Sequence, residues 1–191
     1  MSHAAPPVAK SRGPREWSPE QKAKIEEIVA RYPTKKSAIM PVLWLAQESW
    51  DWLDLDVMRL VGRTLDLPPS HVHAVASFYT MFKKQPTGKY LLEVCHTLSC
   101  ALMGADRIVA HLEKTLDLDE HGNSRDGLFT VHRVECLASC GSAPMMQVGE
   151  HFYEFLTPER VDEIVAAFRA ERPLPTPRPE ANEWQWNSPR S

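Results

Sequence analysis

The four cysteines of this chain fall into two short clusters, and that arrangement constrains the fold more than any other feature of the sequence. The first cluster is Cys95-x4-Cys100 and the second is Cys136-x3-Cys140. A chain of 191 residues that uses cysteine only in these two places is not using it as core filler. Four thiolates are a complete ligand set for one tetrahedral zinc ion or one iron–sulfur cluster. The fold must then bring together two loops that residues 101–135 separate.

Composition restricts the class of protein. Hydrophobic residues make up 43% of the chain and charged residues 25%, which is typical of a soluble globular protein. The net charge of −3 does not indicate a basic surface for nucleic acid. No apolar run reaches the ~18 residues that a membrane span needs, and residues 1–15 lack the apolar core of a secretory signal. We therefore expect a reducing compartment, where metal or redox roles for cysteine are favoured over disulfides.

Residues 18–86 are expected to form a compact helical domain. Ser18-Pro19-Glu20-Gln21 combines an N-cap, a proline at the first helical position and a capping-box glutamine. Apolar residues at helical spacing then predict four short helices, of which the second is capped by Ser37. Their apolar faces are Ile25, Ile28, Val29 and Tyr32; Ile39, Val42, Leu43, Ala46 and Trp50; Val57, Leu60, Val61 and Leu65; and Val72, Val75, Ala76 and Tyr79.

Residues 87–171 are expected to form an α+β domain. Residues 90–94 and 128–134 have the pattern of strands, and residues 145–148 and 152–155 predict a hairpin. The order strand, helix, strand, strand, helix fits a thioredoxin-like domain, with a mixed four-stranded sheet and a helix on each face. The two helical stripes are Leu102, Ala105, Ile108, Val109, Leu112 and Leu116, and then Val161, Ile164, Val165 and Phe168.

Residues 1–17 and 172–191 are expected to be tails. The second contains alternating prolines, which favour an extended and unpacked chain. Trp184 and Trp186 lie near its end. A disordered end is the favoured interpretation of this segment. If the chain docks on a partner, we expect these tryptophans and the helical domain to be the docking surfaces.

The placement of the cysteines bears on the type of metal. Both pairs follow predicted strands, so they lie in loops whose backbone N–H groups are available to the sulfurs of a negatively charged cluster. Zinc loops usually have C-x2-C spacing, which both pairs lack. Thioredoxin chemistry needs the same C-x-x-C motif. The residues favour an iron–sulfur cluster, while a zinc site and redox thiols remain open alternatives. No glycine-rich nucleotide-binding loop is present.

The residues around the cysteines resemble those of a known family. Residues 94–100 (VCHTLSC), 134–140 (VECLASC), 143–148 (APMMQV) and 153–159 (YEFLTPE) are similar to the small iron–sulfur subunit of NADH:quinone oxidoreductase, the E-type or 24-kilodalton-type family. Residues 74–82 (AVASFYTMF) match it as well, so the resemblance covers residues 18–170. The family commonly has Gly-Ala where this chain has Ala138-Ser139. We expect Ala138 to tighten the loop and Ser139 to offer a hydrogen bond to sulfur.

The resemblance implies a helical domain followed by a thioredoxin-like domain that holds one [2Fe-2S] cluster. It implies Cys95 and Cys100 as ligands of one iron, and Cys136 and Cys140 as ligands of the other. The protein would be a non-autonomous electron-transfer subunit of a membrane-bound complex, in its peripheral arm on the cytoplasmic side, or on the matrix side in a mitochondrion. Its cluster would accept an electron from the FMN of a partner flavoprotein subunit, which alone would carry FMN and NADH. Other peripheral-arm subunits would be further partners.

Two alternatives remain. Similar subunits serve NAD-linked hydrogenases and formate dehydrogenases, in which the chemistry is the same and the complex differs. The alternative from another class is a zinc-stapled adaptor protein, in which the four cysteines hold one zinc ion and the helical half binds a partner. Metal content separates the last alternative from the others.

Overall fold

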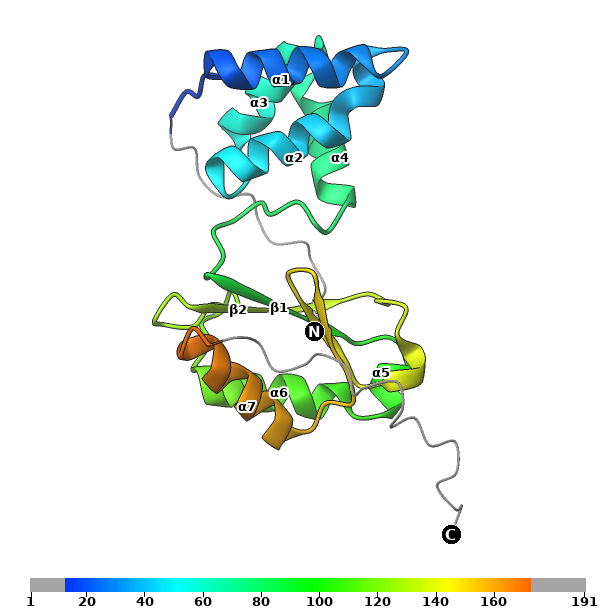
Figure 1. Ribbon diagram of the computed structural model, residues 1–191, viewed down its shortest axis with the longest axis vertical. Coiled ribbons are helices and arrows are strands. Elements are labelled where there is room, and N and C mark those ends of the chain that lie inside the picture. The colour runs from blue at the N-terminus through cyan, green and yellow to red at the C-terminus, as the bar shows by residue number, and fades with distance from the viewer. Residues whose placement is uncertain (1–12, 173–191) are drawn as a thin grey trace. The chain divides into compact units, whose positions relative to one another are not determined.

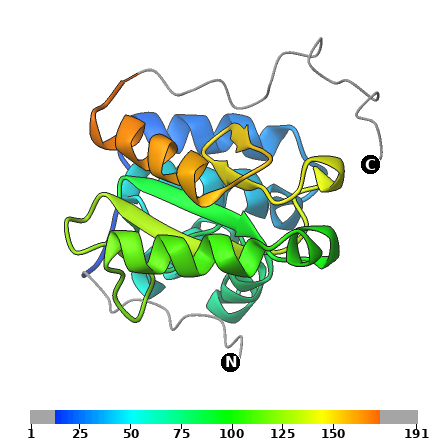
Figure 2. The same cartoon turned by 90° about the horizontal axis from the view of Figure 1, so that it is seen from below.

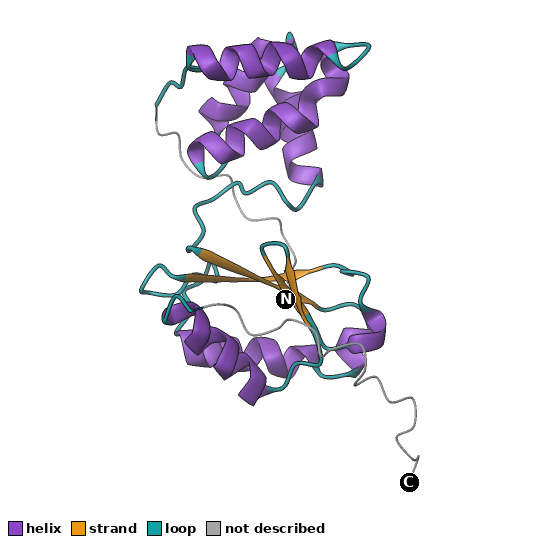
Figure 3. Ribbon diagram, in the orientation of Figure 1, coloured by secondary structure: helices purple, strands orange, loops and turns teal. Residues whose placement is uncertain are grey.

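The structure is a computed structural model that describes residues 13–172. The chain divides into two compact units between Pro86 and Thr87. Among the described residues, the first unit contains only helices and loops, and the strands all lie in the second (Figure 3). The expected tail over residues 172–191, with Trp184 and Trp186, lies outside the described residues except for Arg172.

The described part of the first unit packs its helices around one apolar core. α1 (Pro19–Ala30) begins at Ser18, and the capping box between Ser18 and Gln21 is present as predicted. A 3-10 helix, η1 (Lys35–Ala38), is followed by α2 (Ile39–Trp50), α3 (Leu55–Leu65) and α4 (Pro69–Phe78) (Figure 1). The core contains most of the predicted apolar faces: Ile25, Ile39, Val42, Leu43, Ala46, Val57, Leu60, Val61, Leu65, Val72 and Ala76.

Trp17 is part of this core, although we expected it to belong to a tail. Its side chain is buried and its ring centroid lies 4.8 Å from that of Trp50. Its indole N–H donates to the Thr64 hydroxyl at 2.8 Å. A single tryptophan just before an N-cap has no periodic neighbours, so helical spacing carried no signal for its burial.

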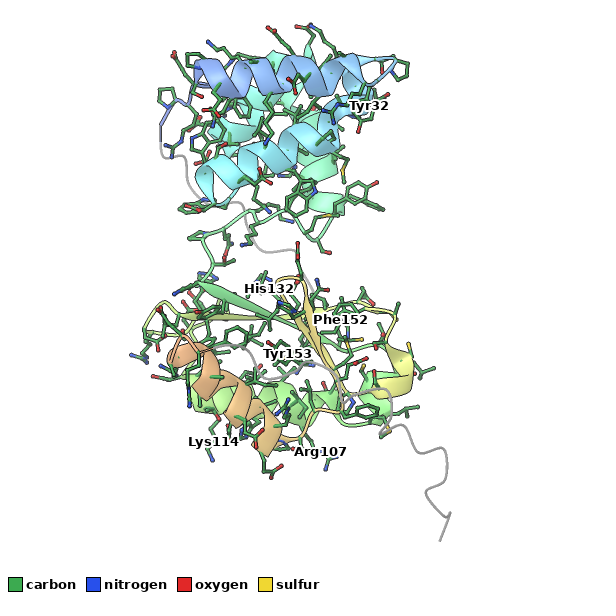
Figure 4. All side chains as sticks on the ribbon, viewed as in Figure 1. Tyr32, Arg107, Lys114, His132, Phe152 and Tyr153 are labelled. Carbon is green, nitrogen blue, oxygen red and sulfur yellow. The ribbon has the colours of Figure 1, made fainter. Side chains whose placement is uncertain are left out.

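Two further details of the helical unit differ from the prediction. Ser37 does not cap α2; it lies within η1, whose N-cap is Thr34, and α2 follows η1 without a side-chain cap. Tyr32 (labelled in Figure 4) and Tyr79 were assigned to apolar helix faces, but both lie beyond the last residue of their helices and remain exposed. The chain has left the helical path there, so the spacing no longer places these side chains on the core face.

The second unit is built on a mixed four-stranded sheet in the order β2-β1-β3-β4, which confirms the predicted fold class. The strands are β1 (Tyr90–Cys95), β2 (Phe129–Val134), β3 (Met146–Val148) and β4 (His151–Tyr153). β1 and β2 are parallel, and β3 is antiparallel to both β1 and β4. The carboxyl ends of β1, β2 and β4 therefore lie at the same edge of the sheet.

Both long helices of this unit cover the same face of the sheet, so the prediction of one helix on each face is wrong. α6 (Ala105–Leu116) and α7 (Pro158–Arg169) lie side by side beneath the strands (Figures 1 and 2), and His111 Nε2 lies 2.7 Å from Asp162 Oδ1 between them. Tyr153 lies between sheet and helices, whereas Arg107 and Lys114 of α6 lie on the far side of that helix (Figure 4). The physical reason is that the buried strand residues face the helices, namely Leu92, Val94, Phe129, Val131, Met146 and Val148.

The first predicted stripe of this domain is divided between two helices. A short helix, α5 (Leu98–Leu102), precedes α6, and Gly104 separates them with a φ of +95°, which a residue without Cβ adopts readily. Leu102 was expected on the core face, but it belongs to α5 and is 78% exposed. The other five residues of the stripe are buried in α6.

Removal of the α3 cap is expected to destabilise the protein. Asp54 is fully buried, and its Oδ1 accepts the N–H groups of Asp56 and Val57 at 3.0 and 2.9 Å. Asp54→Ala should lower the free energy of unfolding by about 2 kcal/mol, because both N–H groups lose their partner in a buried place. Urea denaturation followed by circular dichroism measures the change. Asp54→Asn keeps an acceptor oxygen and should lose less than half as much; an equal loss in both variants would contradict a capping role.

Candidate metal centre

The parallel pairing of β1 and β2 brings the two cysteine loops to one edge of the sheet. Cys95 is the last residue of β1, and Cys100 lies in α5 directly after it. Cys136 follows the end of β2, and Cys140 opens a 3-10 helix, η2 (Cys140–Ser142). The structure therefore places all four predicted ligands at the carboxyl edge of adjacent strands.

The four cysteines are arranged as two pairs. The Sγ atoms of Cys136 and Cys140 are 3.6 Å apart, and the thiols of Cys95 and Cys100 are close enough to hydrogen-bond. All four are free thiols. Within residues 13–172, no three or more cysteine, histidine or acidic side chains are arranged to hold a single metal ion. The arrangement is thus one of two sulfur pairs at a common edge.

Thr97 connects the two loops. Its Oγ1 lies 3.3 Å from Cys95 Sγ, and the same side chain is close enough to Cys136 to lower the pKa of that thiol. Ser99 makes the corresponding contact with Cys140. Hydroxyls of the first loop therefore reach sulfurs of the second. Sequence reasoning did not single out Thr97 as part of the site, because small polar residues beside cysteines are common in loops.

The two pairs differ in their exposure to solvent. Cys95 and Cys100 are each 2% exposed and pack in a small apolar cluster with Ala105, Ala143 and Met145. Cys136 and Cys140 lie on the exposed side of the site. One pair is therefore fixed by packing in the interior, and the other is presented at the surface.

One thiol of each pair is favoured in its ionised form. Burial raises the pKa of Cys95, but hydrogen bonds from the Thr97 side chain and from the N–H groups of Thr97 and Leu137 bring that pKa below its usual value. The pKa of Cys136 is lowered by the N–H of Ala138, then by its bonds from Cys140 and Thr97. Hydrogen bonds to a thiolate stabilise its charge, so these two sulfurs lose a proton more readily than an ordinary cysteine.

The second thiol of each pair, by contrast, is favoured in its protonated form. Burial raises the pKa of Cys100 to about 11, and its hydrogen bond to Cys95 acts in the same direction. The pKa of Cys140 is raised by its hydrogen bond to Cys136 and by the charge of that sulfur. Four thiolates therefore repel one another unless a cationic centre lies between them. The donor set fits a positively charged metal core with four thiolate ligands.

The second loop has an unusual backbone at Ala138. This residue has a φ of +64°, a left-handed conformation that costs a residue with a Cβ roughly 1–2 kcal/mol. Its N–H donates to Cys136 Sγ at 3.3 Å. For this sulfur, the prediction that a backbone N–H group of the loop would be its hydrogen-bond donor is confirmed. The strain is consistent with the expected tightening of the loop. The expectation for Ser139 is wrong, because its hydroxyl donates to the Glu154 carboxylate and not to a sulfur.

Glu154 was not found by sequence reasoning. It follows β4 directly, far along the chain from the cysteine loops, and no spacing relates it to them. Strand order explains its position, because Tyr153 pairs with Met146, which in turn pairs with Val94 near the end of β1.

No helix in the described part of the chain has the length and apolar character to cross a membrane.

Comparison with known proteins identifies the family. Residues 25–169 match the thioredoxin-like [2Fe-2S] ferredoxin family. An E-type subunit of NADH-quinone oxidoreductase from Rhizobium meliloti (strain 1021) is 40% identical over 146 residues, which is 76% of this chain and 87% of that protein. The E-type NADH-quinone oxidoreductase subunit from Mycobacterium bovis is 38% identical over 164 residues, which is 84% of this chain but only 65% of the longer relative.

A solved structure supports the fold. The NAD+-reducing [NiFe]-hydrogenase in its air-oxidized state aligns with a TM-score of 0.58 at 20% identity, over 75% of this chain and 24% of the hydrogenase chain. At that identity the likeness is one of fold alone. The fold, the family match and the relatives agree with the motifs around the two cysteine pairs. The chain belongs to the thioredoxin-like [2Fe-2S] ferredoxin family, as a relative of the E-type subunits of NADH-quinone oxidoreductase.

Proposed function

We propose that Cys95, Cys100, Cys136 and Cys140 hold the [2Fe-2S] cluster of an electron-transfer subunit of NADH-quinone oxidoreductase. Membership of the family supports the type of subunit and its cofactor. The observation that carries the residue assignment is the meeting of two sulfur pairs at the carboxyl edge of β1 and β2. When bound, the cluster supplies a one-electron redox centre, and the protein supplies ligands, orientation and environment.

The spacing within the pairs supports two ligands per iron. Two sulfurs at ~2.3 Å from one tetrahedral ion are ~3.8 Å apart, and the Sγ atoms of Cys136 and Cys140 are 3.6 Å apart. Cys95 and Cys100 are in similar contact. We assign the first pair to one iron and the second pair to the other.

The surroundings of the sulfurs support a tuned redox site. N–H groups of Leu137, Met145 and Ala138 donate to Cys95, Cys100 and Cys136 respectively. Hydrogen bonds to the ligand sulfurs offset the negative charge of a thiolate-bound cluster and raise its reduction potential. The apolar packing of the inner pair limits water on that side, so the exposed pair marks the side on which electrons are exchanged.

The electron donor is a partner subunit that binds NADH and FMN. This assignment is supported by the names of the relatives, which are subunits of an NADH-quinone oxidoreductase, and by the lack of a glycine-rich nucleotide loop in this sequence. The partner would bind the flavin that receives the hydride of NADH, and the cysteine loops of this subunit would hold the centre that takes single electrons from it. Other peripheral-arm subunits complete the assembly, in the cytoplasm or the mitochondrial matrix.

Metal analysis tests the cofactor. The full chain, purified anaerobically, is expected to contain about two irons and two acid-labile sulfides per molecule. After strong reduction it should show a rhombic electron paramagnetic resonance signal. One zinc per chain without labile sulfide would instead establish the zinc-stapled adaptor.

Substitution of an exposed ligand tests the residue assignment. Cys136→Ala should reduce bound iron to roughly a tenth of the wild-type content or less, because one iron loses half of its protein ligands. Cys136 is exposed, so the melting temperature of the metal-free protein should stay close to that of the metal-free wild type. A Cys136→Ala protein that keeps its full iron and sulfide content would rule out this residue as a ligand.

Co-purification tests the partner. A tagged full-length chain isolated from its own host at low salt is expected to bring down a flavin-containing subunit that oxidises NADH. If chains of a hydrogenase or a formate dehydrogenase co-purify instead, the electron-transfer role stays the same but the subunit belongs to another complex. Mass spectrometry of the co-purified chains and the flavin content distinguish these results.

A further inference from the structure

A buried polar network ties the second cysteine loop to the end of β4. Ser142 Oγ donates to Glu154 Oε1 at 2.5 Å, and the Ser139 hydroxyl donates to the same oxygen. The two hydroxyl oxygens are 2.8 Å apart. Glu154 is 7% exposed and Ser142 is 3% exposed. A carboxylate is buried at such a place only if hydrogen bonds satisfy it, and here two of them come from one loop.

The two serines flank Cys140 on both sides. Ser139 precedes Cys140 directly, and Ser142 ends the three-residue helix that Cys140 begins. From the end of this helix onward, the backbone of the loop is hydrogen-bonded to the segment that follows β4. Phe155 N–H donates to the Ser142 carbonyl at 2.8 Å, and Leu156 N–H donates to the Pro144 carbonyl at 2.9 Å. At Ser139 the attachment to the end of β4 is through the side chain.

We propose that Ser139, Ser142 and Glu154 form a latch that holds Cys140 in position for the cluster. The inference rests on the proposed function of the four cysteines. It assigns these three side chains a positioning role, exerted through the loop and not through contact with the metal. The latch also explains why an acidic residue is buried at the carboxyl edge of the sheet.

The need for a latch follows from how differently the two loops are held. Cys95 is fixed within β1, and Cys100 is packed against apolar neighbours. Cys140 lies in an exposed loop that contains the left-handed Ala138, and a strained loop relaxes unless its surroundings hold it. Leu137 and Ala143 pack on either side of this segment, but Cys140 itself is exposed. Hydrogen bonds to a buried carboxylate are charge-assisted and directional, so they add a restraint at the residues next to Cys140.

The test measures how fast the cluster is lost from the full-length protein. Ser142→Ala and Glu154→Leu should release iron to a chelator at least about fivefold faster than wild type, since the first removes one hydrogen bond to Glu154 and the second removes the acceptor of both. Glu154→Gln keeps an acceptor oxygen and should stay within about twofold of wild type. The visible circular dichroism of the cluster should change in the first two variants and not in the third.

A matched control comes from the same unit. Ser124 is also buried, and its hydroxyl donates to the Asp126 carboxylate at 2.6 Å, at the entrance to β2 and away from the cysteines. Ser124→Ala should release iron at the wild-type rate. The double variant Ser142→Ala/Glu154→Leu should be no faster than Glu154→Leu alone, because residues of one network are not additive.

Each outcome decides a separate question. Wild-type iron release and an unchanged spectrum in Ser142→Ala and Glu154→Leu would overturn the latch while leaving the proposed function intact. Equal acceleration in Ser124→Ala would also overturn it, by showing a general loss of stability. A wild-type chain without labile sulfide would refute the proposed function, and the latch with it. If Glu154→Leu does not fold, Ser142→Ala and Ser139→Ala decide the result by the same measurements.

Discussion

The parallel pairing of β1 and β2 is the constraint on which the four-cysteine site depends. The register runs from Tyr90 opposite Phe129 to Cys95 opposite Val134, so both strands end at one edge. An antiparallel pairing would place the two cysteine loops at opposite ends of the sheet. A slip by one residue would turn Leu92 and Val94 away from the helices, and the burial of these side chains opposes it. The apolar core of the unit therefore sets the position of the sulfurs.

The same edge collects groups from distant parts of the chain with opposite electrostatic roles. Backbone N–H groups and the Thr97 hydroxyl favour ionised sulfur at Cys95 and Cys136. Burial opposes ionisation at Cys100, and at Cys140 the hydrogen bond with Cys136 and the charge of that sulfur oppose it. Under the proposed function all four sulfurs bind the metal core as thiolates, so assembly of the centre should release protons. The inner pair is held by packing, and the outer pair is left accessible.

Local patterns predicted the elements well, and the sequence was less informative wherever a contact links distant segments. Helical spacing identified the buried face of α6 but continued by coincidence through Leu102, which Gly104 separates from that helix. The half-buried Glu93 and Gln147 alternate with buried residues on their strands, a pattern that fits a sheet with helices on one face but that the prediction of a helix on each face did not use. The spacing of the cysteines indicated two loops and a four-sulfur site. Trp17 and Glu154 carried no such signal, because tertiary packing and strand order alone determine their places.

Ala138 and Ser139, which are adjacent in the second loop, donate hydrogen bonds to different acceptors. A serine hydroxyl has one proton to donate, and a buried carboxylate oxygen is a stronger acceptor than a sulfur. Ser139 therefore donates to Glu154, and the hydrogen bond to Cys136 comes from the Ala138 N–H. That donor belongs to the residue in the left-handed conformation. Backbone strain and the hydrogen bond to the sulfur thus occur at one residue. The hydrogen bonds among Ser139, Ser142 and Glu154 offset the free-energy cost of the left-handed conformation at Ala138.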